Sequence, residues 1–297
     1  YFARYFSSPR EDIMWYLRLG LNHGGEVRRH YFTHGMRDVT GRPEMKHAHP
    51  EYYALLAGKR DNREDGKNCD QCLSSEGFFQ ENVRFVRAMF DIYDLPLVSV
   101  MPSDGYNVCQ CERCREKYDM SRPRAGRISD YVWGYVNRVA KAVYKTHPDK
   151  KISCSAYADY TLPPTDIDKL SPNIVVAFTH GRGKHITDPR VRKEKEDLWR
   201  VWLKKSSNPL VINEHYVFTH RGTFLPVYFP HAVSVGLKAL QGKSMGETVE
   251  VAIGPGQVRG HGLHRPGFNH LNIYVTARLY WDADLNVDGL LREYYRL

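Results

Sequence analysis

Six cysteines are unevenly distributed along the chain, and their spacing favours a metal site over disulfide bonds. Five of them form two tight groups, Cys69-x2-Cys72 and Cys109-x-Cys111-x2-Cys114. Four thiolates can satisfy one tetrahedral Zn²⁺ ion, and near neighbours suit a shared ion better than mutual disulfides. Reduced structural thiols, or disulfides in an oxidising compartment, are the alternatives. Cys154 stands alone in an apolar run, where a small buried side chain is expected.

Carboxylate and aromatic side chains follow several short apolar runs that are predicted to be strands. These residues are Asp104, Tyr157, Asp159, His180, Glu214, His215, Tyr216 and Glu247. Two carboxyl groups can act as the acid and as the base or nucleophile of glycoside cleavage, and aromatic rings stack on sugar faces. The set therefore indicates a carbohydrate site.

These residues differ in how strongly they indicate a function. Asp104 lies in a Pro-Ser-Asp-Gly turn, where aspartate is commonly the turn-former itself. Glu214 follows Val-Ile-Asn and closes a strand that has no structural need for a charge, so a functional role is favoured there. His180 could bond a sugar hydroxyl or cap its own turn.

The elements that must position these residues alternate from about residue 78 onwards. Apolar residues at helical spacing predict helices, and β-branched runs bounded by turn residues predict buried strands. The predicted helices span residues 78–93, 128–147, 190–205, 230–237, 269–280 and 287–295. The predicted strands span residues 95–101, 151–157, 172–178, 210–214 and 238–242, with two more expected at 27–32 and 68–75.

Strands that alternate with helices form parallel sheets through right-handed crossovers. This repetition, without a dinucleotide-binding glycine motif, favours a (β/α)8 barrel, in which strand-end residues meet at one rim. Seven strands are predicted, one short of a closed barrel. We therefore expect one barrel domain over residues 1–297, with the N-terminal part of the barrel outside this chain. A two-domain α/β arrangement is the alternative, although no linker composition supports it.

Composition and charge exclude several classes of protein. The 297 residues are 42% hydrophobic and 26% charged, which is ordinary for a globular protein and excludes collagen-like, coiled-coil and fully disordered chains. The net charge of +9 invites a nucleic-acid partner, but the basic clusters lack interleaved aromatic residues, so none is expected. No apolar run approaches the roughly 18 residues of a membrane span.

Several motifs resemble one known family. They are His49-Pro-Glu-Tyr-Tyr-Ala-Leu55 with Gly58-Lys-Arg60, Gln71-Cys-Leu-Ser74, Ser103-Asp-Gly-Tyr106 with the cysteines that follow, Glu214-His-Tyr216, Leu271-Asn-Ile-Tyr274, Leu279-Tyr-Trp-Asp282 and Val287-Asp288. Their order and spacing resemble the domain of unknown function 4838 over nearly the whole chain. That group includes glycoside hydrolase family 163, endo-β-N-acetylglucosaminidases that act on complex N-glycans.

The resemblance implies a barrel hydrolase, secreted or periplasmic, from bacteria that harvest glycans. It leads us to expect a retaining enzyme that cleaves β-linked N-acetylglucosamine, with Glu214 as general acid/base. Asp104 would orient the acetamido group if the sugar itself supplies the nucleophile. The substrate-binding residues would be Tyr157, Asp159, His180, Tyr216 and Glu247.

The resemblance also bears on the cysteines. It implies that Cys72 ends the strand before the Asp104 strand, so that Cys72 and the three cysteines after Asp104 would share one site. That ligand set is Cys72, Cys109, Cys111 and Cys114. Four protein ligands leave no open position, so the site would hold a structural zinc that braces the Asp104 loop. No cofactor is expected for catalysis.

Two other functions stay open. One is an α-glucuronidase-like or other barrel glycosidase that uses Glu214 and a second carboxylate as an inverting pair. The other is a carbohydrate-binding protein without catalytic activity. In all three cases the partner is an oligosaccharide or glycan.

Overall fold

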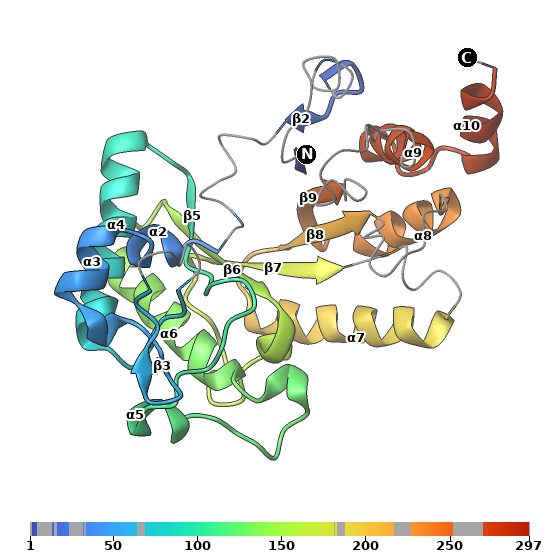
Figure 1. Ribbon diagram of the computed structural model, residues 1–297. Helices are drawn as coiled ribbons and strands as arrows, with labels where there is room; N and C mark the ends of the chain where they lie inside the picture. The colour runs from blue at the N-terminus through green and yellow to red at the C-terminus, as the bar shows by residue number, and fades with distance from the viewer. Residues whose placement is uncertain are drawn as a thin grey trace, which may run out of the picture. The chain divides into compact units, whose positions relative to one another are not determined.

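A computed structural model describes residues 2–4, 14, 17–23, 32, 34–63, 69–180, 182, 188–216, 227–251 and 270–296 (Figure 1). Only the backbone is described at residues 2–4, 22–23, 180 and 250–251. The chain forms two compact units. Unit 1 contains residues 1–26, 179–199 and 210–297, and unit 2 contains residues 27–178 and 200–209.

Unit 2 carries the first series of alternating strands and helices. Its elements are α2 (Arg37–Thr40), α3 (Pro43–Ala48), β3 (Leu55–Leu56), β4 (Lys59–Arg60), α4 (Glu76–Tyr93), β5 (Leu97–Ser99), α5 (Glu112–Arg115), α6 (Ser129–Tyr144), β6 (Lys151–Ala156) and β7 (Ile174–His180), whose last two residues belong to unit 1. β5, β6 and β7 pair in parallel, with Val98 opposite Ile152 and Cys154 opposite Val176. These strands confirm the predicted parallel arrangement.

The apolar faces of α4 and α6 pack together, with α4 against β5 and α6 against β6. The rings of Phe78 and Tyr135 stack with centroids 5.7 Å apart, and Asn82 Nδ2 donates to the Tyr135 hydroxyl at 3.1 Å. α4 begins two residues before its predicted start because the Ser75 hydroxyl caps it, accepting a hydrogen bond from Phe78 N. It ends at Asp94, which adopts a left-handed conformation with φ of 47°.

Unit 1 contains further parallel strands and the C-terminal helices. Its elements are β1 (Phe2–Arg4), β2 (Asn22–His23), α7 (Pro189–Lys205), β8 (Leu210–Tyr216), α8 (Pro230–Leu240), β9 (Ser244–Val251), α9 (His270–Trp281) and α10 (Val287–Tyr294). The last six residues of α7 belong to unit 2. β8 pairs with β9, β9 with β1 and β1 with β2, all in parallel. Buried residues of α8, α9 and α10 form the core of this unit, including Val233, Val275 and Leu290.

The structure corrects two predicted strands. Residues 238–242 form the end of α8 and a turn, because Leu240 continues the buried helical face begun by Val233 and Gly242 turns with φ of 72°. The strand that follows is β9, which begins at Ser244. Residues 69–75 form no strand: Gln71 makes an isolated bridge to Tyr53, and Ser75 caps α4. The predicted strand at 27–32 lies outside the described residues, apart from Phe32.

The α/β class with parallel strands is therefore confirmed, whereas closure into a single eight-stranded barrel domain stays a prediction. Across the described residues, no helix combines the length and apolar character that a bilayer crossing requires.

Candidate functional site

Glu214 lies in β8 of unit 1, at the position where the sequence predicts a functional carboxylate. Side chains alternate along a strand, so Glu214 shares a face with Ile212 and Tyr216, and all three are fully buried. Its Oε1 accepts hydrogen bonds from the backbone N–H groups of Arg182 at 2.8 Å and His215 at 3.1 Å. Its Oε2 has no hydrogen-bond partner within the described part of the chain.

Arg182 joins Glu214 to Glu247 and is the main residue that the sequence did not single out. Its guanidinium forms a two-pronged ion pair with Glu247: Nη1 donates to Oε2 at 2.9 Å, and Nη2 pairs with Oε1. The Tyr280 hydroxyl donates to the same Glu247 Oε2 at 2.8 Å. Arg182 Nη1 lies 3.6 Å from Glu214 Oε2, an ion-pair distance that is too long for a hydrogen bond.

The charges in this cluster identify Glu214 as the carboxyl group that retains a proton. Burial raises the pKa of Glu214 to about 7, and the Glu247 carboxylate adds to the increase, while Arg182 opposes it. One guanidinium can neutralise one carboxylate, and both terminal nitrogens of the Arg182 guanidinium contact Glu247. Because Oε1 already accepts two N–H groups, the proton belongs on Oε2, which has no hydrogen-bond partner in the described part of the protein. A buried, protonated carboxyl group of this kind can act as a general acid.

Glu247 and Tyr216, both predicted to bind substrate, have internal partners. Glu247 lies inside β9 and not at a strand end, because the strand starts later than predicted. With Tyr280 and Met245 it also lines a pocket at the start of β9. The Tyr216 hydroxyl lies 2.5 Å from Thr276 Oγ1, and its ring packs against Phe229 with centroids 5.0 Å apart. Substrate contacts of Glu247 and Tyr216 stay predictions.

Asp104 belongs to unit 2 and follows β5, as predicted. Its side chain is 58% exposed. Asp104 Oδ1 accepts a hydrogen bond from the Tyr157 hydroxyl at 3.2 Å and lies 3.6 Å from Nε2 of His34. The rings of His34 and Tyr157 meet edge to face at 6.0 Å. The structure thus brings together two of the predicted residues and adds His34, which the sequence analysis did not assign to this group.

Asp159, another predicted substrate-binding residue, contacts Arg124 and the start of α6. Asp159 accepts a hydrogen bond from Nε of Arg124 at 3.0 Å, and its carbonyl oxygen accepts one from Ile128 N at 3.3 Å. It therefore ties the end of β6 to the start of α6. The side chain of His180 lies outside the described residues.

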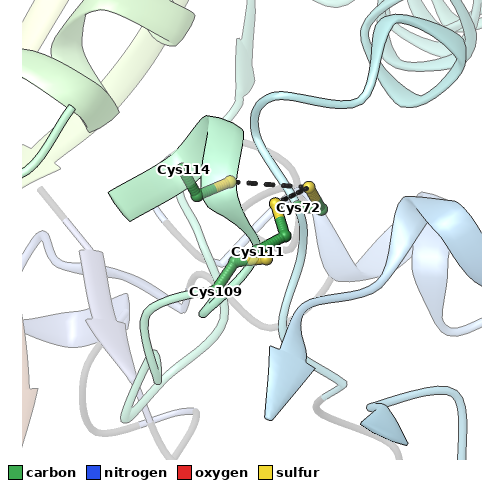
Figure 2. A group of neighbouring side chains, drawn as sticks. All are labelled: Cys72, Cys109, Cys111 and Cys114. Carbon is green, nitrogen blue, oxygen red and sulfur yellow. Dashed lines mark hydrogen bonds between the residues drawn. The ribbon is translucent and has the colours of Figure 1, made fainter. Parts of the chain in front are cut away.

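The four cysteines of the predicted ligand set converge in unit 2 (Figure 2). Their Sγ atoms all lie within 4.8 Å of one another, and the side chains of Cys72, Cys109 and Cys114 are buried. Cys69 and Cys154 are not part of the group. The set could hold a metal ion. Cys72 reaches it from an irregular segment next to the Gln71 bridge, and not from the strand end that was expected.

Gly236 of α8 leaves room for the Arg182 side chain, which predicts an unusual response to substitution. A Cβ atom built on Gly236 would lie 2.5 Å from Arg182 Nε and 3.2 Å from its Cδ. Replacing glycine inside a helix with alanine normally stabilises a protein by about 0.5–1 kcal/mol. We expect Gly236→Ala to destabilise this one by about 1–3 kcal/mol, because the buried guanidinium cannot move away without losing its ion pairs.

The matched control is Gly134→Ala in α6, where no described atom lies within 4 Å of the added Cβ apart from chain neighbours and the helix's own backbone. This variant should show the ordinary stabilisation. Urea unfolding of both variants measures the difference, and equal effects of the two substitutions would contradict the packing of Arg182 against α8.

Comparison with known proteins identifies a family but no described activity. No curated protein matches the chain. Among solved structures, the catalytic domain of the major endoglucanase from Xanthomonas campestris pv. campestris is similar at 11% identity and a TM-score of 0.30, over 76% of this chain and 80% of that one. A likeness at this level carries no argument about function. The family model described as "Domain of unknown function (DUF4838)" matches residues 4–297, nearly the whole sequence, and the chain belongs to that family.

Proposed function

We propose that this protein is a retaining glycoside hydrolase that cleaves β-linked N-acetylglucosamine in complex glycans by substrate-assisted catalysis. The observation that carries the proposal is Glu214, a buried carboxyl group whose pKa is raised to about 7 and whose Oε2 has no hydrogen-bond partner among the described residues. The likeness of its motifs to those of endo-β-N-acetylglucosaminidases supports the choice of sugar. A secreted or periplasmic location is part of the same proposal.

In the first step, the Glu214 carboxyl group is the general acid. The bond between the sugar C1 and the glycosidic oxygen breaks, and that oxygen takes the proton from Glu214 Oε2. The carbonyl oxygen of the sugar's own acetamido group bonds to C1 and gives a cyclic oxazolinium intermediate. Because Glu214 is fully buried, this step requires the substrate to displace whatever side chains cover Oε2.

In the second step, Glu214 is the general base. The carboxylate accepts a proton from water as that water attacks C1 on the face that the leaving group vacated. The bond between C1 and the acetamido oxygen breaks, so the β configuration is retained and one water is consumed. Asp104 is assigned to accept a hydrogen bond from the acetamido N–H and to offset the positive charge that the group acquires. Its exposed carboxylate and its contact with Tyr157 suit that role.

The arrangement of Glu247 favours this scheme over an inverting carboxylate pair in unit 1. An inverting enzyme needs a second carboxylate that can activate water. Both Glu247 oxygens are occupied, because they contact the Arg182 guanidinium and Oε2 also accepts from the Tyr280 hydroxyl. A mechanism that takes its nucleophile from the substrate needs no such second carboxylate.

A panel of aryl glycosides together with a complex N-glycan tests the proposal. We expect hydrolysis of β-N-acetylglucosaminides, a β-configured first product by NMR, and little activity on glucosides that lack the acetamido group. Asp104→Asn should lower kcat on the N-acetylated substrates by about 10²-fold, in line with the loss of one charge-stabilising group. An α-configured product would support the inverting alternative, and binding without turnover of any substrate would support a carbohydrate-binding protein.

A further inference from the structure

The cluster formed by Cys72, Cys109, Cys111 and Cys114 has sulfur positions that suit tetrahedral metal coordination. Cys72 Sγ lies 3.6 Å from Cys114 Sγ and 3.9 Å from Cys111 Sγ. With zinc–sulfur bonds of about 2.3 Å at tetrahedral angles, ligand sulfurs are about 3.8 Å apart. A disulfide requires a separation of about 2.05 Å. The observed distances therefore fit four ligands around one ion.

Hydrogen-bond donors surround the sulfurs in the way that bound thiolates require. Leu55 N donates to Cys109 Sγ at 3.2 Å. The Tyr131 hydroxyl accepts from Leu73 N at 2.8 Å and lies 3.0 Å from Cys114 Sγ, so it can donate its proton to a thiolate at that position. Such outer contacts orient metal ligands and stabilise their charged form.

We propose that these four cysteines bind one Zn²⁺ ion in a closed site that fixes the loop carrying Asp104. All four ligands come from the protein, so no position is left for water or substrate, and the ion's role is structural. Soft thiolate ligands in a tetrahedral set select zinc over magnesium or calcium. The assignment of the ion does not depend on the proposed glycosidase activity.

The effect on the Asp104 loop follows from contacts next to the ligands. Gln71 precedes Cys72, and its Nε2 donates to Ser103 Oγ at 2.7 Å, one residue before Asp104. The Tyr106 hydroxyl donates to the Gln71 carbonyl oxygen at 2.9 Å. The ion would hold the segment around Cys72 to the segment from Cys109 to Cys114, and these contacts transmit the restraint to residues 103–106.

Metal analysis of the full chain tests the assignment. We expect one zinc per chain after gel filtration, and Co²⁺ exchanged into the protein should show the absorption of tetrahedral thiolate coordination. Cys114→Ser should abolish stoichiometric binding, whereas Cys154→Ala, which removes a buried thiol outside the cluster, should leave it unchanged. If Cys114→Ser does not fold, Tyr131→Phe provides a milder change and should lower zinc affinity about 10–100-fold.

Removal of the ion tests the link to the loop. Chelation should lower the Tm and speed amide hydrogen exchange at residues 103–111, and added Zn²⁺ should reverse both effects. A folded wild-type chain that binds neither Zn²⁺ nor Co²⁺, or that contains a disulfide within the cluster, would overturn the proposal. These readouts are independent of turnover, so a failed glycosidase assay leaves them unaffected. Metal binding without a change in exchange at residues 103–111 would overturn the link to Asp104 alone.

Discussion

We expect Glu214→Gln to lower kcat/KM on a β-N-acetylglucosaminide by about 10²–10⁴-fold, the usual contribution of a positioned general acid. Glutamine keeps the size of the side chain and a carbonyl oxygen for the N–H groups of Arg182 and His215, but it cannot deliver a proton. The loss should be much smaller for aryl glycosides with acidic phenols, because their leaving groups need little protonation. Glu116→Gln, on the exposed surface next to α5, is the control and should leave kcat/KM unchanged.

The pH profile gives an independent test of the same residue. With its pKa raised to about 7 by burial, Glu214 is protonated below that pH and deprotonated above it. The kcat/KM of the wild type should therefore fall about tenfold per pH unit above 7, and Glu214→Gln should lose this dependence. A variant that keeps both its rate and its alkaline decline would exclude Glu214 as the acid.

The same shift affects stability, with a definite sign. The folded-state pKa lies above the ordinary value of 4.5, so the unfolded chain releases the proton first as pH rises. Ionisation of Glu214 therefore lowers the free energy of unfolding progressively as the pH rises from about 4.5 to 7. The free energy of unfolding of the Glu214→Gln variant should depend less on pH in that range.

We expect Arg182→Met to destabilise the protein by about 3–5 kcal/mol, because it leaves the Glu247 carboxylate buried without its counter-ion. Arg182 and Glu247 have side chains that are 3% and 2% exposed, so water cannot replace the lost pair. The substitution also removes the positive charge that opposes the increase in the pKa of Glu214, so the alkaline decline in activity should move to higher pH. A merely structural role for Arg182 would not move that decline.

Two further variants identify the cause of the loss. Adding Glu247→Gln to Arg182→Met should recover part of the stability, since the uncompensated charge is then gone. Arg192→Met, in the exposed part of α7, should change the free energy of unfolding by less than about 0.5 kcal/mol. If Arg182→Met were no more destabilising than Arg192→Met, the result would contradict a buried ion pair between Arg182 and Glu247.

Local patterns were sufficient for most of the elements. The apolar spacing of α4 and α6 depends on residues three or four positions apart. The small and apolar residues of β6 and the β-branched run of β7 are buried on both faces. Each pattern is therefore contained in its own segment. The α8–β9 boundary was missed because Lys238-Ala-Leu240 is compatible with either a helix or a strand, and packing of Leu240 against the core selects the helix.

Local patterns in the chain specify the chemical groups: a strand that carries Glu214, a turn with Asp104, and cysteines at metal-binding spacing. The partners of these groups depend on contacts between segments that are far apart in the sequence. Arg182 and Glu247 are 65 positions apart, and Arg182 lies in a basic stretch that resembles a solvated loop, so no local pattern indicates that its guanidinium is buried. That pairing leaves Glu214 as the carboxyl group that holds a proton, because a single buried cation can neutralise only one of two carboxylates.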